Sequence, residues 1–279
     1  MLRILQSWCL GLVMLSVSGG LLAQTDKATA EQLVRKSGLW EQLASLSPQV
    51  QDAFSAALER GGKPTSDAER QRLAGVLADA YAPQRLQAAA IGTVSRRLGA
   101  AHVPVLKRWY DSPTGRQVTR LEEAASADPV EPDVVVREGV AVLERASPAR
   151  RALLEQLLKE TRAAEALVQI AINSSLAIHR GVTSMQAQAP AMSSKELRAL
   201  MEAQRPQMLQ GFSGMMLAGF ARTYEPLPDD VLRQYVAFLG SKSGAHFNAV
   251  AIEALDAALT EAAAAMGRGL PGTRDGLNT

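Results

Sequence analysis

Trp109-Tyr110-Asp111-Ser112-Pro113-Thr114-Gly115 is the stretch of sequence that decides the fold. Its pattern returns in Phe238-Leu239-Gly240-Ser241-Lys242-Ser243-Gly244, where an aromatic residue, a serine and a glycine occupy the same places 129 residues later. We interpret the two stretches as copies of one helical corner. The first copy is the clearer of the two because it contains a proline.

The proline of the first copy predicts the end of one helix and the start of another. Val105, Leu106 and Trp109 have the spacing of one helix face, so a helix is expected before the proline. Pro113 has no N–H to donate and disfavours an α conformation at the residue before it. Ser112 is therefore expected to be the N-cap of a new helix whose first residue is Pro113.

The second copy predicts a corner of the same kind. Gly240 is suited to a left-handed C-terminal cap, and Ser241 to an N-cap. Gly115 and Gly244 then fall at the third position of their helices, where glycine is a poor helix former. A side chain at either glycine is expected to strike the preceding helix, so both copies predict a tight corner between two helices.

The composition favours helices throughout. Ala, Leu, Gln, Glu, Arg and Met dominate, and the one run of β-branched residues, Val134–Val136, follows a proline suited to a helix start. The sequence predicts an all-α fold with a first helix over about residues 28–44 and another that starts at Ser47-Pro48. A capping box at Ser66 and a break at Pro83 are expected further along.

Three short matches relate the two halves of the chain. Glu31–Ser37 resembles Glu155–Thr161 at a shift of 124 residues, Ser66 matches Ser193 at a shift of 127, and the corners match at 129. Such a pattern is expected of a duplicated unit with small insertions, and chance similarity in an alanine- and leucine-rich chain is the alternative. The predicted organisation is two related antiparallel helical-bundle units packed together, at 24–131 and 148–266, with a connecting helix at 132–147, a mobile connection at 181–191 and a disordered tail at 267–279.

The first 23 residues have the pattern of a signal peptide. Arg3 provides a positive charge, Ile4–Leu22 is uncharged and mostly apolar or small, and Ala23 is suited to cleavage. A retained membrane anchor is the alternative. Cys9 lies inside the apolar run, away from the usual lipoprotein position, and the chain after Ala23 has no cysteine. We expect a periplasmic protein, with an extracellular location as the alternative, that is not an integral membrane protein once processed.

The charge of the chain excludes one class of partner. Basic and acidic residues number 30 and 28, and they are interspersed along the sequence. A nucleic-acid-binding protein concentrates its basic residues on one face. Aromatic residues make up only 4% of the chain, which also argues against stacking of bases. The sequence therefore predicts no nucleic-acid partner.

The chain resembles a bacterial exported domain-of-unknown-function family, number twenty fifty-nine. The resemblance lies in an aromatic-x-x-Ser-Pro-x-Gly motif, here Trp109–Gly115, which follows a helix expected at Val103–Arg108. The second copy departs from the motif because Lys242 replaces the proline and Leu239 replaces the usual aromatic residue beside Phe238. The resemblance implies an envelope location and a helical fold. It implies no catalytic residues, because the family has no established activity.

No signature in the sequence indicates catalysis, a cofactor or a metal. The three histidines, His102, His179 and His246, have no partner at the spacing of a helical metal site. Gly240–Gly244 lacks the spacing of a phosphate-binding loop. The adjacent carboxylates Glu122 and Glu123 are expected to diverge on a helix. We therefore predict no catalytic, cofactor-binding or metal-binding residues.

The methionines provide the one suggestive pattern. Met201, Met208 and Met215 recur every seven residues, and Phe212 and Phe220 extend the same apolar face. Core packing is one interpretation, because methionine fills irregular gaps. An apolar groove for a ligand or a partner helix is another, and thioether ligation of cuprous copper is a third.

The sequence favours a non-enzymatic function. We expect an envelope binding or protein-interaction module that engages a protein, a peptide or an apolar ligand. The alternatives are a hydrolase or another enzyme whose site is assembled only in three dimensions, and a structural role in the envelope. A cleft that brings His179 or His246 together with a carboxylate and a serine would favour the enzyme.

Overall fold

A computed structural model describes residues 24–60, 66–128, 130–183 and 192–269. Within these ranges the regular structure is helical, and the one β-type contact is an isolated bridge between Gln24 and Gly99. The predicted all-α fold is thus confirmed. The predicted signal peptide, residues 1–23, lies outside the described residues. In the part that the structure describes, no helix combines the length and the apolar character needed to cross a membrane.

Twelve α-helices and one short 3-10 helix make up the described part of the chain. Four of the α-helices begin with a proline. The bounds are α1 Lys27–Lys36, α2 Leu39–Arg60, α3 Asp67–Ala80, α4 Pro83–Arg97, η1 Ala100–His102, α5 Val103–Asp111, α6 Pro113–Ala127, α7 Pro132–Arg145, α8 Pro148–Thr161, α9 Ala163–Thr183, α10 Ser194–Thr223, α11 Asp229–Gly240 and α12 Lys242–Gly269.

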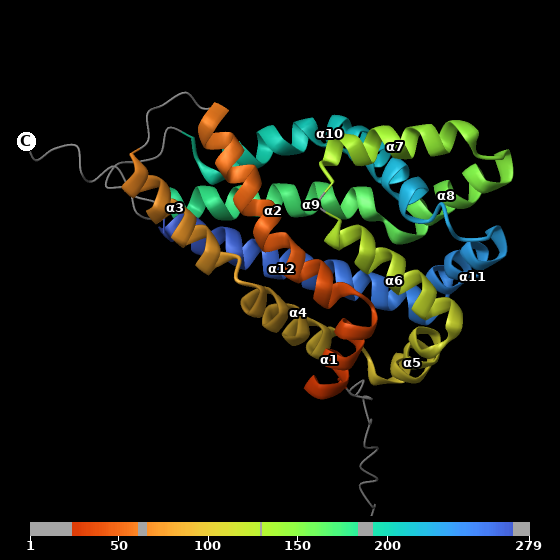
Figure 1. Cartoon of the computed structure of the whole chain (residues 1–279). Coiled ribbons are helices and arrows are strands. Elements are labelled where there is room, and N and C mark those ends of the chain that lie inside the picture. Colours follow the sequence, from red (N-terminus) through yellow and green to blue (C-terminus); the bar gives the residue numbers. More distant parts are fainter. Residues whose placement is uncertain (1–23, 61–65, 129, 184–191, 270–279) are drawn as a thin grey trace, which may run out of the picture.

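The last helix, α12, is the central one. It contacts both α9 and α4, and it lies between them in Figure 1. Helix α10 packs against α9 and α7. The helices of the two corners also contact each other crosswise, because α6 touches α11 and α12 touches α5. The two corners are therefore neighbours in space.

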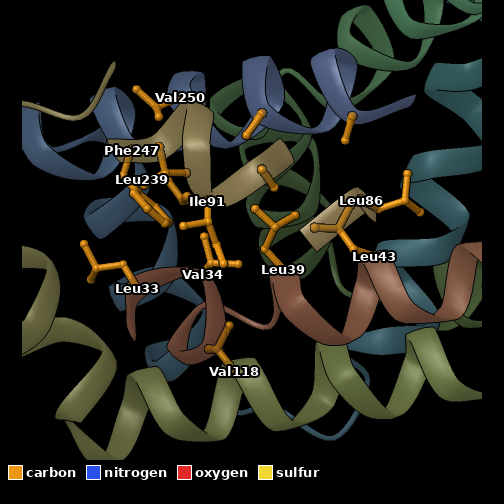
Figure 2. Close-up of a cluster of buried hydrophobic side chains, with 14 of the residues drawn as sticks. Leu33, Val34, Leu39, Leu43, Leu86, Ile91, Val118, Leu239, Phe247 and Val250 are labelled. Carbon is orange, nitrogen blue, oxygen red and sulfur yellow. The ribbon is translucent and has the colours of Figure 1, made fainter. Parts of the chain in front are cut away.

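The main hydrophobic core joins residues from both halves of the sequence. Leu39 of α2 and Val118 of α6 belong to the same buried cluster as Leu239 of α11 and Phe247 of α12. Figure 2 shows these four side chains in one cluster. A smaller cluster lies elsewhere, around Ile172 of α9.

The two corners have nearly the same backbone. Ser112 has φ −72° and ψ 156°, and Ser241 has φ −71° and ψ 155°. Each serine hydroxyl donates to the carbonyl of the aromatic residue three positions earlier, Trp109 or Phe238, at 2.6 Å. The same oxygen accepts from the N–H of the residue three positions later, at 2.9 Å and 3.1 Å. Both predicted N-caps are confirmed.

Gly115 and Gly244 are required because each lies very close to a carbonyl group of the preceding helix. A Cβ atom on Gly115 would lie 2.1 Å from the Trp109 carbonyl oxygen, and one on Gly244 would lie 1.9 Å from the Phe238 carbonyl oxygen. The predicted reason for glycine at these positions is confirmed. The predicted left-handed cap at Gly240 is wrong, because Gly240 is the last residue of α11 and has no positive φ.

The N-terminal helices begin and end at places that differ from the prediction. The helix expected over residues 28–44 is interrupted at Gly38, whose φ of +76° separates α1 from α2. Arg162, the residue 124 positions later, has a φ of +52° and separates α8 from α9 in the same way. Neither break was predicted from the sequence.

The predicted helix start at Ser47-Pro48 is also wrong, because Pro48 lies inside α2. Ser47 is 7% exposed, and its hydroxyl accepts a hydrogen bond from the Gln51 side chain at 3.1 Å, so it does not cap a helix. Pro48 is exposed. Helix α9 extends to Thr183 and α12 to Gly269, each three residues into a segment that was expected to be irregular. The remainders, residues 184–191 and 270–279, lie outside the described part.

Candidate functional site

The candidate site is a cavity between the two corners. Its volume is about 410 Å³, and its lining comes from helices of both halves of the chain. On α6 the lining residues Val118, Thr119 and Glu122 follow Gly115 with the spacing of one helix face. On α12 the matching face begins at Gly244 and also lines the cavity. The two corners therefore set the directions of α6 and α12, the helices that form these two walls of the cavity.

Aromatic side chains are concentrated around this cavity. The sequence has three Trp, four Tyr and five Phe, and seven of these twelve residues line it. The Trp109 ring stacks on the Phe238 ring with centroids 4.3 Å apart and an interplanar angle of 5°. It also lies nearly parallel to the Tyr235 ring, at 6.0 Å. The seven aromatic residues are Trp109, Tyr110, Phe220, Tyr224, Tyr235, Phe238 and Phe247.

Glu122 is the one charged residue among the side chains that line the cavity. Its Oε1 atom accepts hydrogen bonds from the hydroxyl groups of Tyr224, at 2.6 Å, and Tyr235, at 2.7 Å. Tyr224 directly follows α10 and Tyr235 belongs to α11, so residues from three parts of the chain meet at one carboxylate oxygen. Within the described residues, no hydrogen bond reaches Oε2 of Glu122 or the hydroxyl of Tyr110.

Burial controls the protonation of this cluster. It raises the pKa of the Glu122 carboxyl above the ordinary value of 4.5, the two tyrosine hydrogen bonds oppose the rise, and the negative charge of Glu123 adds to it. Burial also raises the pKa of Tyr110, Tyr224 and Tyr235, and the charge of Glu122 contributes to each of these shifts. The tyrosine hydroxyls are therefore protonated hydrogen-bond donors at neutral pH.

A larger depression, of about 560 Å³, lies between α6, α7 and α10. Arg222 in its wall donates to Asp128 and to Glu138, at 2.7 Å in each case. The charges here are paired with each other, whereas Glu122 in the corner cavity faces no cation. The corner cavity is therefore the better candidate for a ligand site.

The motif residues fall into two groups. Ser112 and Ser241 cap helices, Pro113 starts one, and the two glycines allow the close approach described above. The aromatic residues Trp109, Tyr110 and Phe238 line the cavity, as does Gly244. The motif therefore has a structural part and a part that faces the candidate site.

The residues of the predicted apolar groove do not share one surface. Met201, Met208 and Phe212 pack against the smaller buried cluster on α9. Phe220 packs against the main core and lines the corner cavity. Met215 is 36% exposed. Met201, Met208 and Met215 therefore do not line the candidate site, whereas Phe220 does.

Two of the histidines meet at another place. The His102 and His246 rings stack with centroids 4.4 Å apart, and His102 Nδ1 lies 3.0 Å from the Ser243 hydroxyl. Desolvation lowers the pKa of His102, and the nearby His246 and Lys242 lower it further. No carboxylate of the described chain forms an ion pair with either ring. The described residues also contain no cluster of three or more potential metal ligands drawn from His, Cys, Asp and Glu.

Glu122 was not predicted as a site residue. Glu122 and Glu123 were expected only to diverge on a helix, which they do, since Glu123 does not line the cavity. The signal that could have identified Glu122 is its place on the helix face that carries Gly115 and Val118. Comparison with protein-family models, with curated proteins and with solved structures gives no match to this chain.

Proposed function

We propose that this chain is a non-catalytic binding protein that holds a small, mainly apolar molecule in the corner cavity. The single observation that carries the proposal is the combination of a cavity of about 410 Å³ with a concentrated aromatic lining. Ligand pockets in proteins typically measure about 300–1,000 Å³ and are mostly apolar, with a few polar groups that fix orientation. Glu122 and the tyrosine hydroxyls supply such groups here.

The cellular location of the protein and the evolutionary origin of its two halves are also part of the proposal. We propose that the protein acts in the bacterial envelope after cleavage of residues 1–23, on the basis of the charge and hydropathy pattern of that segment. We also propose that the two halves derive from one duplicated unit. The matched corners and the matched positive φ values at Gly38 and Arg162 support the duplication, since both pairs agree with the sequence shifts.

The proposal is tested by filling the cavity. Gly219 of α10 lines the cavity, and a Cβ atom built on it meets nothing within 4 Å, so a side chain has room to enter. We expect Gly219→Phe to weaken the binding of n-octanol, an apolar probe with one hydroxyl, by roughly tenfold or more. Isothermal titration calorimetry of the chain without residues 1–23 measures this effect.

The same helix offers a matched control. Gly214 of α10 is exposed, does not line the cavity, and also has open space around a Cβ atom. Gly214→Phe is expected to leave octanol binding unchanged. Equal binding by both variants, or no binding of octanol by the unmodified chain, contradicts the proposed function.

A further inference from the structure

We infer that the corner cavity selects ligands that carry a positively charged amino group on an apolar body. The inference rests on the proposed function and names the chemical class of the ligand. It starts from the charge of the lining: among the described residues that line the cavity, Glu122 is acidic and none is Lys, Arg or His. An anionic ligand would meet this carboxylate with no cation to balance it.

The carboxylate has unused capacity for a donor. Both tyrosine hydroxyls donate to Oε1 of Glu122, so Oε2 has no hydrogen-bond donor within the described part of the chain. An ammonium group carries three donors and no acceptor. It can therefore donate a charge-assisted hydrogen bond to Oε2 while the tyrosines keep their bonds to Oε1.

The aromatic rings favour the same charge. Trp109, Tyr110, Tyr224 and Tyr235 line the cavity together with Glu122. The face of an aromatic ring attracts a cation, and Trp does so most strongly. A neutral apolar ligand gains nothing from this attraction and gives Oε2 of Glu122 no donor. The aromatic rings and the Glu122 carboxylate therefore both attract an ammonium group.

The test compares two probes that have the same chain and different head groups. We expect n-octylamine, which is protonated at neutral pH, to bind about tenfold or more tightly than n-octanol at pH 8. Glu122→Gln keeps the size of the side chain and an oxygen that accepts from both tyrosines. It should remove the preference for the amine, so that the two probes bind the variant with similar affinities.

Glu123→Gln is the matched control, because Glu123 is the adjacent carboxylate on α6 and does not line the cavity. It should retain the preference for the amine. Equal affinities of the two probes, or a preference that survives Glu122→Gln, overturns the inference. Octanol binding that depends on Gly219 would then leave the proposed function intact, whereas failure of both probes to bind contradicts the two together.

A pH series on the unmodified chain gives a second measurement that needs no variant. The titratable groups that face Glu122 are Tyr110 from α5, Glu123 from α6, Tyr224 just after α10 and Tyr235 from α11. The tyrosines stay protonated because their pKa values are raised. Amine binding should strengthen as the pH rises through the raised pKa of Glu122, whereas octanol binding should stay level. Amine binding that is level across this range also overturns the inference.

Discussion

The corner at Ser112 and the corner at Ser241 have the same backbone and different surroundings. Their serine φ and ψ angles agree within one degree, although one helix begins with Pro113 and the other with Lys242. Seven residues beyond the corner glycines, α6 carries Glu122 whereas α12 carries Ala251, and both residues line the cavity. The comparison teaches that the serine and the glycine are enough to build the corner. The residues on the helix that follows decide what the corner can bind.

The largest expected effect comes from the glycines. We expect Gly115→Ala and Gly244→Ala each to cost about 3 kcal/mol or more of stability, because the added methyl group would overlap a carbonyl oxygen of the preceding helix. Denaturant unfolding of each variant measures the loss. Gly214→Ala, on the exposed face of α10, is the control and should be neutral or stabilising, since alanine is the better helix former. A small loss at one corner only would show that the two corners are not equivalent.

A smaller effect is expected from the contact that joins the corners. Trp109 and Phe238 stack face to face, so their contributions to stability should not be additive. A double-mutant cycle with Trp109→Leu and Phe238→Leu should give a coupling energy of about 1 kcal/mol. Urea unfolding of the four proteins provides the values. A coupling energy near zero would mean that the two corners are packed side by side without a specific contact.

The smallest effect tests the difference between the two copies at the first residue of the second helix, Pro113 or Lys242. Ser241 already has the extended conformation that a residue before proline requires, and position 242 is the first residue of its helix. Lys242→Pro should therefore stabilise the protein by about 0.5 kcal/mol, because proline restricts the unfolded chain. Pro113→Lys should have the opposite sign. Thermal unfolding of both variants checks the pair, and a loss of stability from Lys242→Pro would disprove the equivalence of the helix starts.

The sequence predicted the corners because the interactions that form them are local. Ser112, Pro113 and Gly115 lie within one turn of helix, and their roles follow from backbone sterics and a single hydroxyl group. The same dipeptide misled at Ser47-Pro48, where the serine is buried and the helix continues through the proline. Local chemistry permits both outcomes at a Ser-Pro pair. The packing of the surrounding helix decides between them.

The candidate site was less predictable because its parts are distant in sequence. Glu122 lies 102 residues from Tyr224 and 113 residues from Tyr235. The spacing on α6 places Glu122 on the buried face, yet nothing in the sequence shows which hydroxyl groups will meet it. The methionine pattern was visible in the sequence and led away from the cavity, since most of those side chains pack against α9.

The position of Trp109 has a spectroscopic consequence. Indole fluorescence depends on the surroundings of the ring, and this ring stacks on Phe238 in the wall that a ligand would touch. The sequence has two other tryptophans, of which Trp8 belongs to the predicted signal peptide and Trp40 lies under the guanidinium group of Arg35, 3.4 Å from the ring centroid. A Trp40→Phe variant that begins at Gln24 would keep a single emitter, placed at the corner. The protein would then report occupation of its own cavity by a change in emission, without an attached dye.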